Sequence, residues 1–317
     1  AFVRAVDGWC DAGLAAVWEG EHCTWSQEAG VARDPKAAAA KRYVGSPGMN
    51  AISKGLLEGV TAARYRTRAV ARRRRSSKQG AAIGWTLEHG KTGEHLGEFD
   101  FLICSDKTAA ARFRNDLDRT LKGFVEPASG VPSAPSLALM VATTSTNLGA
   151  LSSLLLDGHP HFSWISRDDS KPGRGRDDGN ECWVAHSSPA FTQSLFDDLK
   201  PKKGQEKRVF PGAFRAAVVK ELVPPFEALL SELSTAAAPG QPRPKVVMAQ
   251  GHRWGAAFPT AHLPDACSPS DHGGAYYLDT ENDFAACGDY FSAYPGRVEG
   301  GWISGFSLAN TLLKMGK

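Results

Sequence analysis

The C-terminal part of the sequence combines an acidic residue with a run of small residues at spacings that suit ligand binding. The apolar run 284–287 ends in Gly288-Asp289, which is typical of a buried strand that stops at a turn. From Glu299 onward the spacing is helical. The amides and positive dipole end of such a helix favour a negatively charged group, and the carboxylate of Asp289 suits the hydroxyls of a polyol or a ribose. Small residues recur four apart on one face of this helix: Gly301, Gly305 and Ala309. The stretch therefore predicts a strand, a ligand-sized loop and a helix, and the alternative is a βα turn that binds nothing.

Tryptophan and histidine residues recur on predicted strands of the second half of the chain. We expect Trp164, Trp183 and Trp254 to stack on a flat or cationic substrate, with Trp254 counted among the catalytic residues. His186 is the other candidate catalytic residue, which would orient the substrate or transfer a proton, and His252 is a candidate substrate contact. The alternatives are tryptophans that belong to the core and histidines with structural hydrogen bonds only.

These residues lie in a segment whose pattern predicts an antiparallel sheet. Its strands are expected at three apolar runs separated by hydrophilic loops: 137–144, 162–166 and 181–186. Alternation along the strands places Phe162, Trp164 and Ser166 on one face, and Val184 with His186 on one face of the next strand.

Other stretches predict the elements around this sheet. The run Phe99–Cys104 is typical of a buried parallel strand. One helix is expected over 109–121, and another over 213–233 with an interruption at Pro224-Pro225.

The composition is that of an ordinary globular protein, with 317 residues of which 42% are hydrophobic and 22% charged. No apolar run approaches the roughly 20 residues of a membrane span, so we expect a soluble, intracellular protein without membrane contact. The net charge of +3 gives no argument for nucleic acid, and Arg72–Arg75 is expected to be a solvated hairpin loop because turn residues follow it. Six scattered cysteines without ligand spacing predict a reducing compartment and no metal.

Several blocks of the chain resemble the flavin-containing amine-oxidase superfamily, most closely its renalase-like branch. The strand end Gly288-Asp289, with a helix that begins Val-Glu-Gly-Gly-Trp-Ile-Ser-Gly, resembles the C-terminal FAD motif of that family. Further blocks resemble the branch in the same order: Arg42-Tyr43-Val44-Gly45-Ser46-Pro47-Gly48, Trp164-Ile165 with Lys171-Pro172-Gly173-Arg174, Trp183-Val184-Ala185-His186, and His252-Arg253-Trp254. The resemblance extends from about residue 42 to the end of the chain, and several independent blocks in the right order make it specific.

The resemblance implies FAD as the cofactor and assigns roles to the C-terminal motif. Asp289, with Gly288 before it, would hold the ribityl and phosphate region of the flavin. The backbone around Gly300, Gly301 and Trp302 would face the pyrimidine edge of the isoalloxazine, where a helix dipole stabilises negative charge on the reduced ring.

Two further cofactor contacts are implied by the same resemblance, namely the turn at Gly48 near the flavin and the backbone near Val70 against the adenine side. The sequence also departs from the family pattern, because no GxGxxG motif follows an apolar strand anywhere in it. We therefore expect the N-terminal phosphate-binding unit to lie outside these residues, and we expect weak or absent FAD retention by this chain alone.

The fold class expected from these observations is α/β: an FAD/NAD(P)-binding Rossmann-like domain, incomplete at its N-terminus, with an inserted antiparallel-sheet substrate domain. Residues 1–41 would bridge to the missing nucleotide-binding unit. Residues 42–125 and 259–317 would form the FAD-binding domain, and residues 126–258 the substrate domain.

The function expected is that of an FAD-dependent oxidoreductase that accepts a hydride from a carbon next to nitrogen in an amine or a dihydropyridine. Its partner would be a small-molecule substrate rather than nucleic acid or a membrane, and the sequence leaves the oligomeric state open. One alternative is a non-catalytic remnant of a flavoprotein fold that acts as a binding or scaffold module. Another is a nicotinamide-dependent dehydrogenase, in which the Gly-Asp-helix block has no role.

Overall fold

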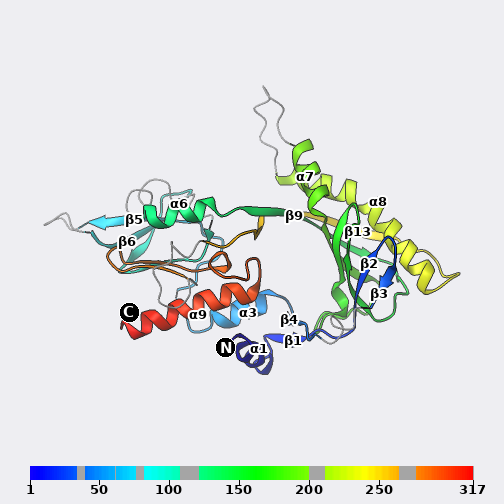
Figure 1. Ribbon diagram of the computed structural model, residues 1–317, viewed down its shortest axis with the longest axis horizontal. Helices are drawn as coiled ribbons and strands as arrows, with labels where there is room; N and C mark the ends of the chain where they lie inside the picture. The colour runs from blue at the N-terminus through cyan, green and yellow to red at the C-terminus, as the bar shows by residue number, and fades with distance from the viewer. Residues whose placement is uncertain are drawn as a thin grey trace. The chain divides into compact units, whose positions relative to one another are not determined.

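The computed structural model describes residues 1–33, 40–60, 62–75, 82–107, 121–199, 211–263 and 276–316 (Figure 1). The chain forms two compact units. The large-sheet unit contains Val3–Gly59 and Pro135–Ala256 with Ala1, and the small-sheet unit contains Val60–Ala134 and Ala257–Lys317 with Phe2. A helix was expected over 109–121. Of these residues only Leu121 lies within the described ranges, so this prediction stays untested.

A seven-stranded sheet forms the centre of the large-sheet unit. Its strands follow the order β13 (Val246–Pro259), β9 (Ser133–Thr143), β12 (Glu181–Ser187), β11 (Phe162–Arg167), β10 (Leu151–Leu156), β2 (Glu21–Ser26) and β3 (Gly30–Ala32). Strands β9, β12, β11 and β10 pair antiparallel as expected, whereas β10 pairs with β2 in parallel. The sheet thus combines strands from the start and the middle of the sequence.

One face of this sheet packs against the helices α7 (Pro189–Asp198) and α8 (Pro211–Ala237). The core contains Leu137, Leu154 and Ile165 from the strands and Val218 and Phe226 from α8. Alternation along the strands turns the remaining side chains toward the opposite face, which we call the open face of the sheet.

The alternation expected on β11 is wrong at its first residue. Phe162 and Ile165 both belong to the core, because the pairing of β11 with β12 shifts register between Phe162 and Trp164. Such a bulge places one extra residue in the strand and therefore changes which face the residues before it occupy. Trp164 and Ser166 keep the shared face that was expected.

Helix α8 is continuous, so the expected interruption at Pro224-Pro225 is wrong. A proline inside a helix costs about 3 kcal/mol because it removes a backbone hydrogen bond and crowds the preceding turn. Leu222 before the prolines and Phe226 and Leu229 after them are all buried against the sheet. Burial on both sides of the proline pair therefore holds the helix together.

The first 60 residues add a small layer to the large-sheet unit. It consists of α1 (Phe2–Asp11), α3 (Asn50–Leu56) and the antiparallel pair β1 (Ala15–Val17) and β4 (Tyr43–Gly45). A short helical turn, η1 (Asp168–Ser170), follows β11.

The small-sheet unit contains the predicted strand, loop and helix at the C-terminus. Strand β15 (Phe284–Ala286) pairs in parallel with β8 (Leu102–Cys104) and antiparallel with β14 (Tyr277–Asp279). The turn η3 (Asp289–Phe291) and helix α9 (Val298–Lys314) follow, and α6 (Lys122–Gly130) contributes Phe124 to the core. The parallel strand that the sequence predicts is thereby confirmed at Leu102–Cys104, while Phe99 ends a different strand, β7. Its expected burial is wrong at Ile103, which is half exposed, because only Cys104 of this strand lies in the core.

A second antiparallel sheet of this unit contains β5 (Ala69–Arg75), β6 (Ala82–His89) and β7 (His95–Phe99). Arg72–Arg75 lie in β5 and not in a loop, so that expectation is wrong. Neighbouring strands supply acidic partners, since Arg72 pairs with Glu88 and Arg74 with Glu98. The guanidinium of Arg73 lies 4.7 Å from the ring centroid of the buried Trp85.

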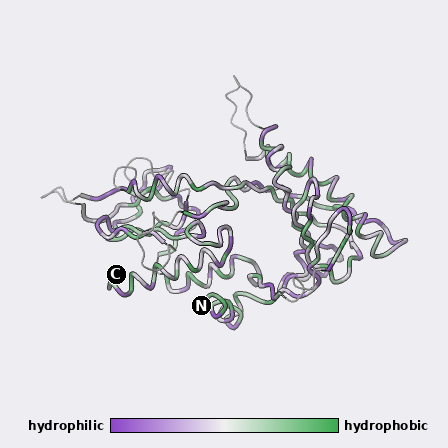
Figure 2. Tube along the Cα trace, in the orientation of Figure 1, coloured by the Kyte–Doolittle hydropathy of each residue, from purple (hydrophilic) through white to green (hydrophobic). Residues whose placement is uncertain are grey.

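Helix α9 is amphipathic. Figure 2 shows hydrophobic and hydrophilic residues interspersed along it, and its buried side holds Gly300, Ser304, Leu308 and Leu312. Within the described ranges, no helix combines the length and the apolar character needed to cross a membrane.

Candidate functional site

The end of β15 forms a tight turn that only glycine can occupy. Gly288 has φ of 149°, and a Cβ atom built there would lie 2.5 Å from the ring of Tyr290 and 3.2 Å from the carbonyl oxygen of Ser105. Its N–H donates to Oγ of Ser304 on α9 at 2.9 Å, which ties the strand end to the helix. The predicted Gly-Asp turn thus has a definite geometry that fixes the position of Asp289.

Asp289 organises the loop that leads to α9. Its Oδ2 accepts a hydrogen bond from the N–H of Gly296 at 2.9 Å, and Gly296 has a positive φ of 73°. This bond uses one carboxylate oxygen, and a carboxylate has a second oxygen that can accept hydrogen bonds from the hydroxyls of a ligand. We call Gly288, Asp289, Gly296 and Ser304 the Asp289 cluster.

Lys107 provides positive charge near this cluster. It follows β8, and its ammonium donates to Oγ of Ser133 and to the carbonyl oxygen of Val131. Burial lowers the pKa of Lys107, while the negative charges of Asp289 and Asp106 act in the opposite direction. The ends of the parallel strands β8 and β15 therefore bring opposite charges together, at the sheet edge where α/β proteins commonly bind ligands.

The N-terminal part of α9 contains one glycine that is packed and one that is open. A Cβ atom on Gly300 would lie 2.3 Å from the carbonyl oxygen of Tyr294, whereas nothing lies within 4 Å of a Cβ on Gly301 or Gly305. The indole of Trp302 stacks on Phe306, with ring centroids 4.6 Å apart. No other described residue packs against the helix at Gly301 or Gly305, so this surface is available to a ligand.

The small residues farther along α9 line an apolar groove of about 460 Å³. Its walls are formed by β8, the end of β15 and α9: Ile103, Cys287, Gly305, Leu308, Ala309, Leu312 and Leu313. Burial raises the pKa of the Cys287 thiol, which keeps it a neutral, apolar group at physiological pH.

Val70, the predicted contact on the adenine side, lies in β5 opposite Glu88. It belongs to the sheet β5–β6–β7, whereas Asp289 follows a strand of the sheet β14–β15–β8. No described contact joins Val70 to the Asp289 cluster, and the role of Val70 stays a prediction.

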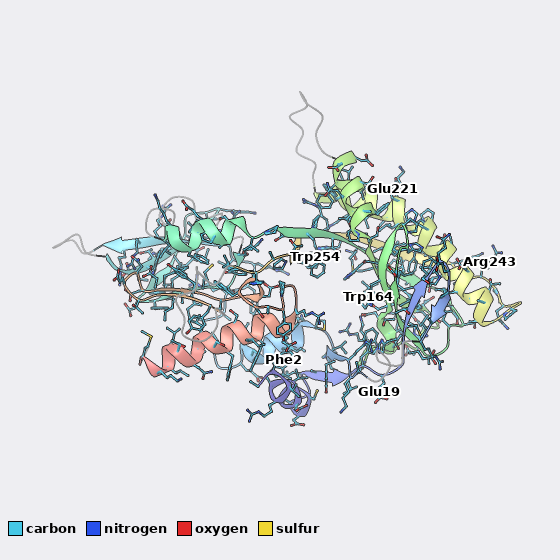
Figure 3. The ribbon with its side chains drawn as sticks, viewed as in Figure 1. Phe2, Glu19, Trp164, Glu221, Arg243 and Trp254 are labelled. Atoms are coloured by element: carbon cyan, nitrogen blue, oxygen red, sulfur yellow. The ribbon has the colours of Figure 1, made fainter. Side chains whose placement is uncertain are left out.

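The open face of the large sheet gathers aromatic, imidazole and ammonium groups. Trp164 on β11 lies opposite His186 on β12, and their ring centroids are 5.2 Å apart. The Nζ atom of Lys171 lies 5.9 Å from the ring centroid of Trp164 and 5.1 Å from that of Trp18. Trp18 contacts His22 edge-on at 4.6 Å. We call Trp18, His22, Trp164, Lys171 and His186 the Trp164 cluster, and Figure 3 shows Trp164 on the side of the sheet away from α8.

Hydrogen bonds fix the members of the Trp164 cluster that lie deepest. The indole N–H of Trp18 donates to Oγ of Ser170 at 3.0 Å, and Nδ1 of His22 lies 2.7 Å from Oγ of Ser153. The second ring nitrogen of His22 lies 3.2 Å from the carbonyl oxygen of Trp18. These contacts give Trp18 and His22 structural roles. Trp164, Lys171 and His186 are the half-buried members of the cluster.

The turn that contains Gly48 is joined to the loop after η1. The guanidinium of Arg174 donates to the carbonyl oxygens of Pro47 at 2.7 Å and Gly45 at 3.1 Å. A Cβ atom on Gly173 would lie 3.2 Å from Oγ of Ser46, so the two loops touch. The structure thus brings together two sequence blocks that resemble the same family and places both beside the Trp164 cluster.

The other predicted site residues on this sheet occupy different faces. Trp183 is 1% exposed and belongs to the core on the helix side, which favours the structural alternative for this residue. His252 and Trp254 on β13 have ring centroids 4.4 Å apart. Gly251, which precedes the pair, contacts α8, and Arg253, which lies between the two residues, contacts α7 and α8. Because side chains alternate along a strand, His252 and Trp254 point toward the open face. Trp254, labelled in Figure 3, is 55% exposed by its accessible surface.

Sequence reasoning missed three members of the Trp164 cluster, namely Trp18, His22 and Lys171. Lys171 was noted only within the block Lys171-Pro172-Gly173-Arg174, and that block is the signal that could have identified it. Trp18 and Trp164 are 146 positions apart, so their common contact with Lys171 has no local signature.

The histidines of the large-sheet unit make its stability depend on pH. Burial lowers the pKa of His22, His159 and His186 below the ordinary value of 6.5, and the charge of Lys171 adds to this effect at His186. Protons therefore bind the unfolded chain first as the pH falls. The stabilisation is complete above pH 6.5 and is lost as the pH falls through the folded-state values. We expect the free energy of unfolding, measured by urea titration, to decrease between about pH 7.5 and about pH 5.

A matched pair of variants checks the origin of this pH dependence. His186→Gln removes one of the three groups, so its free energy of unfolding is expected to depend less steeply on pH than that of the wild type. His95→Gln makes the same change at an exposed histidine of the small-sheet unit and serves as the control for the substitution itself. Equal slopes for all three proteins would contradict the assignment to His186.

The turn between β4 and α3 gives a further prediction. A Cβ atom on Gly45 would lie 2.5 Å from the carbonyl oxygen of Gly48 and 2.6 Å from Cα of Met49, both backbone atoms. The nearest atom to a Cβ on Gly48 is 3.1 Å away, at the end of the flexible Asn50 side chain. We expect Gly45→Ala to lower the free energy of unfolding by about 1–3 kcal/mol and Gly48→Ala by much less, as measured by urea titration. Equal losses in the two variants would contradict the close packing of this turn.

Comparison with known proteins bears on the fold. No protein-family model matches the chain. Among solved structures, the chain is similar to an oxidoreductase from Methanosarcina mazei, with a TM-score of 0.51 and 13% identity over 84% of this chain and 55% of that chain. It is also similar to a double mutant of putrescine oxidase with redesigned cofactor binding, with a TM-score of 0.50 and 12% identity over 86% of this chain and 54% of that chain. The chain thus spans about half the length of the structures that it matches.

Identities of this size show the fold alone. The fold class expected from the sequence is confirmed by these two structures and by the mixed α/β architecture with its additional antiparallel sheets. The chain has a mixed α/β fold with a Rossmann-like domain and additional antiparallel sheets, similar to the folds of these two structures.

Proposed function

We propose that the protein is an FAD-dependent oxidoreductase of the amine-oxidase superfamily, in its renalase-like branch, that accepts a hydride from a carbon next to nitrogen in an amine or a dihydropyridine. The observation that carries the proposal is the Asp289 cluster. A strand end of the α/β sheet places a carboxylate next to a loop and the N-terminus of a long helix, as the sequence resemblance implies for FAD. The likeness in fold to two oxidoreductases agrees with this proposal.

The residues present fit an isoalloxazine and its ribityl chain. Asp289 offers carboxylate oxygens to ribityl hydroxyls, and the N-cap residue of α9, Arg297, makes no side-chain cap to the helix N-terminus. Among the described residues, nothing lies within 4 Å of a Cβ atom built on Gly301, which leaves room for a flat ring beside the first turn of α9. When bound, FAD supplies the hydride-accepting chemistry, and α9 stabilises negative charge through its dipole.

The Trp164 cluster and the pair His252 and Trp254 are proposed to bind the substrate. Trp164, His186 and Trp254 offer ring surfaces on the open face of the sheet for a flat molecule. His186 has a pKa lowered mainly by burial, so it is neutral at physiological pH and can accept a proton from the substrate nitrogen. Trp183 is not retained in the proposed site because it lies in the core.

The experiment that tests this proposal is a titration of the purified chain with FAD, followed by the visible spectrum and by quenching of flavin fluorescence. These 317 residues contain no GxGxxG motif, so we expect FAD to bind weakly. A titration at equilibrium detects weak binding, whereas a weakly bound cofactor is lost during desalting. Saturable binding, with bleaching of the flavin band when a dihydropyridine or an amine is added without oxygen, supports an enzyme. The absence of any binding at millimolar FAD would reject the cofactor, and binding without bleaching would favour the non-catalytic alternative.

A further inference from the structure

We propose that Lys171 selects the charge of the ligand that stacks on the open face of the large sheet. The surface formed by Trp164 and His186 is inferred to accept a neutral or anionic flat ring and to reject an ammonium compound. The proposal rests on the proposed function in taking this surface as the substrate surface. Lys171 is then a specificity-determining residue.

The ammonium of Lys171 already occupies the position of a cation between two indoles. Its Nζ atom lies 5.1 Å from the ring centroid of Trp18 and 5.9 Å from that of Trp164. Aromatic rings attract cations through their negative faces when the charge lies within about 6 Å of the ring centroid. Both indoles therefore already interact with a cation of the protein. The two tryptophans do not offer an empty aromatic cage to the ammonium group of a substrate.

The ion pairs nearest Lys171 contain more cations than carboxylates. Oδ1 of Asp168 accepts hydrogen bonds from Lys171 at 2.8 Å and from Arg174 at 2.7 Å, so one carboxylate serves two cations. Burial opposes ionisation of Asp168, but its bonds to these two cations outweigh burial and lower its pKa, so it stays ionised. Asp169 has its own partner in Arg167 at 3.8 Å. In these pairs three cations, Arg167, Lys171 and Arg174, share the two carboxylates of Asp168 and Asp169.

A ligand that stacks on Trp164 or His186 lies close to the positive charge of Lys171. The ring centroids of Trp164 and His186 are 5.2 Å apart, and Lys171 is within cation–π distance of Trp164. The side chain of Lys171 is only 10% exposed, so water screens its charge less than it screens a surface lysine. A protonated amine on this surface would meet an unfavourable field, and a carboxylate or a neutral ring would not.

The test compares three ligands that share one ring and differ in charge: benzoate, benzyl alcohol and benzylamine. Each is titrated into the full chain without FAD, and binding is followed by tryptophan fluorescence, with Trp164→Phe used to assign the signal. We expect benzylamine to bind at least about tenfold more weakly than benzyl alcohol, and benzoate to bind at least as tightly as benzyl alcohol. In Trp164→Phe the ligand-induced change should be lost or strongly reduced.

Two variants separate the charge of Lys171 from its packing. Lys171→Met keeps most of the apolar stem, and we expect it to bring benzylamine and benzyl alcohol to nearly equal affinity. Lys171→Arg keeps the charge and should keep the order of the wild type. If Lys171→Met does not fold, a salt series on the wild type replaces it, because added salt should narrow the difference between the two ligands.

Failure of this inference is distinct from failure of the proposed function. Equal binding of benzylamine and benzyl alcohol by the wild type, or an unchanged preference in folded Lys171→Met, would overturn the role of Lys171. The role of Lys171 would also be overturned if neither Lys171→Met nor added salt altered the order of the three ligands. The same holds if the ligand-induced fluorescence change survived in Trp164→Phe. Loss of FAD binding would reject the flavoprotein proposal but would not change the order of these three ligands.

Discussion

Replacing Asp289 by Asn is expected to weaken FAD binding by about ten- to a hundredfold, because a hydrogen bond to a charged acceptor contributes about 1.5–3 kcal/mol. The amide oxygen of Asn can still accept the hydrogen bond from the N–H of Gly296, which lies 2.9 Å from Oδ2 of Asp289 in the wild type. The variant therefore removes the charge while the loop keeps its internal bond. The measurement is the dissociation constant for FAD, obtained by quenching of flavin fluorescence.

The control for this prediction is Asp100→Asn, which removes a charge from an exposed side chain of the same unit. We expect this variant to bind FAD as the wild type does. Urea titration of both variants would show that their stabilities are similar, so that a loss of binding reports the site. If Asp289→Asn and the wild type bind FAD equally, Asp289 does not contact the cofactor, and the observation that carries the proposed function no longer supports it.

Replacing Gly300 by Ala is expected to lower the free energy of unfolding by about 1–3 kcal/mol or more, because the added methyl group overpacks a closed contact. A Cβ atom there would lie 2.3 Å from the carbonyl oxygen of Tyr294, and a backbone atom cannot move aside as the end of a side chain can. Gly301→Ala is the matched control, since nothing lies within 4 Å of its added methyl group. In a helix interior, Ala is favoured over Gly by about 0.8–1.0 kcal/mol, so this variant should be at least as stable as the wild type.

Urea or thermal unfolding of the two variants tests this pair of expectations directly. A stable Gly300→Ala protein would show that α9 can shift away from the loop at Tyr294. FAD titration of Gly301→Ala adds independent information, because a methyl group placed where the flavin ring is proposed to lie should weaken binding without loss of stability. Unchanged FAD binding by this variant would place the ring away from Gly301.

If the open face binds the substrate, as proposed, the position of Lys171 favours a neutral ring over a protonated amine. An amine is protonated at neutral pH, whereas a neutral ring can approach the Trp164 cluster without meeting the charge of Lys171. The pair His252 and Trp254 lies on the same open face but has no cation–π contact with Lys171 among the described residues. Charge selectivity is therefore expected to depend on Trp164 and Lys171 rather than on Trp254.

The sequence alone determined the elements whose signals are local. The apolar run before Gly288-Asp289 and the helical spacing after it predicted β15 and α9, and the run that ends at Cys104 predicted the parallel strand β8. Local signals suffice here because burial, turn chemistry and helical periodicity act between residues that are near in the chain. The fold class followed from these elements together with the resemblance of several sequence blocks to the flavin-containing amine-oxidase superfamily.

The tertiary structure decided the features that depend on packing between distant segments. The bulge before Trp164 moved Phe162 into the core, and burial on both sides of Pro224-Pro225 kept α8 continuous. Trp183 and Trp164 look alike in sequence, yet one faces the core and the other the open face. The pairing of β2 with β10 brings His22 to Ser153 across 131 positions. No local pattern encodes such contacts, because their free energy arises only when the whole sheet has formed, and for that reason the position of Lys171 between Trp18 and Trp164 could be learned only from the folded protein.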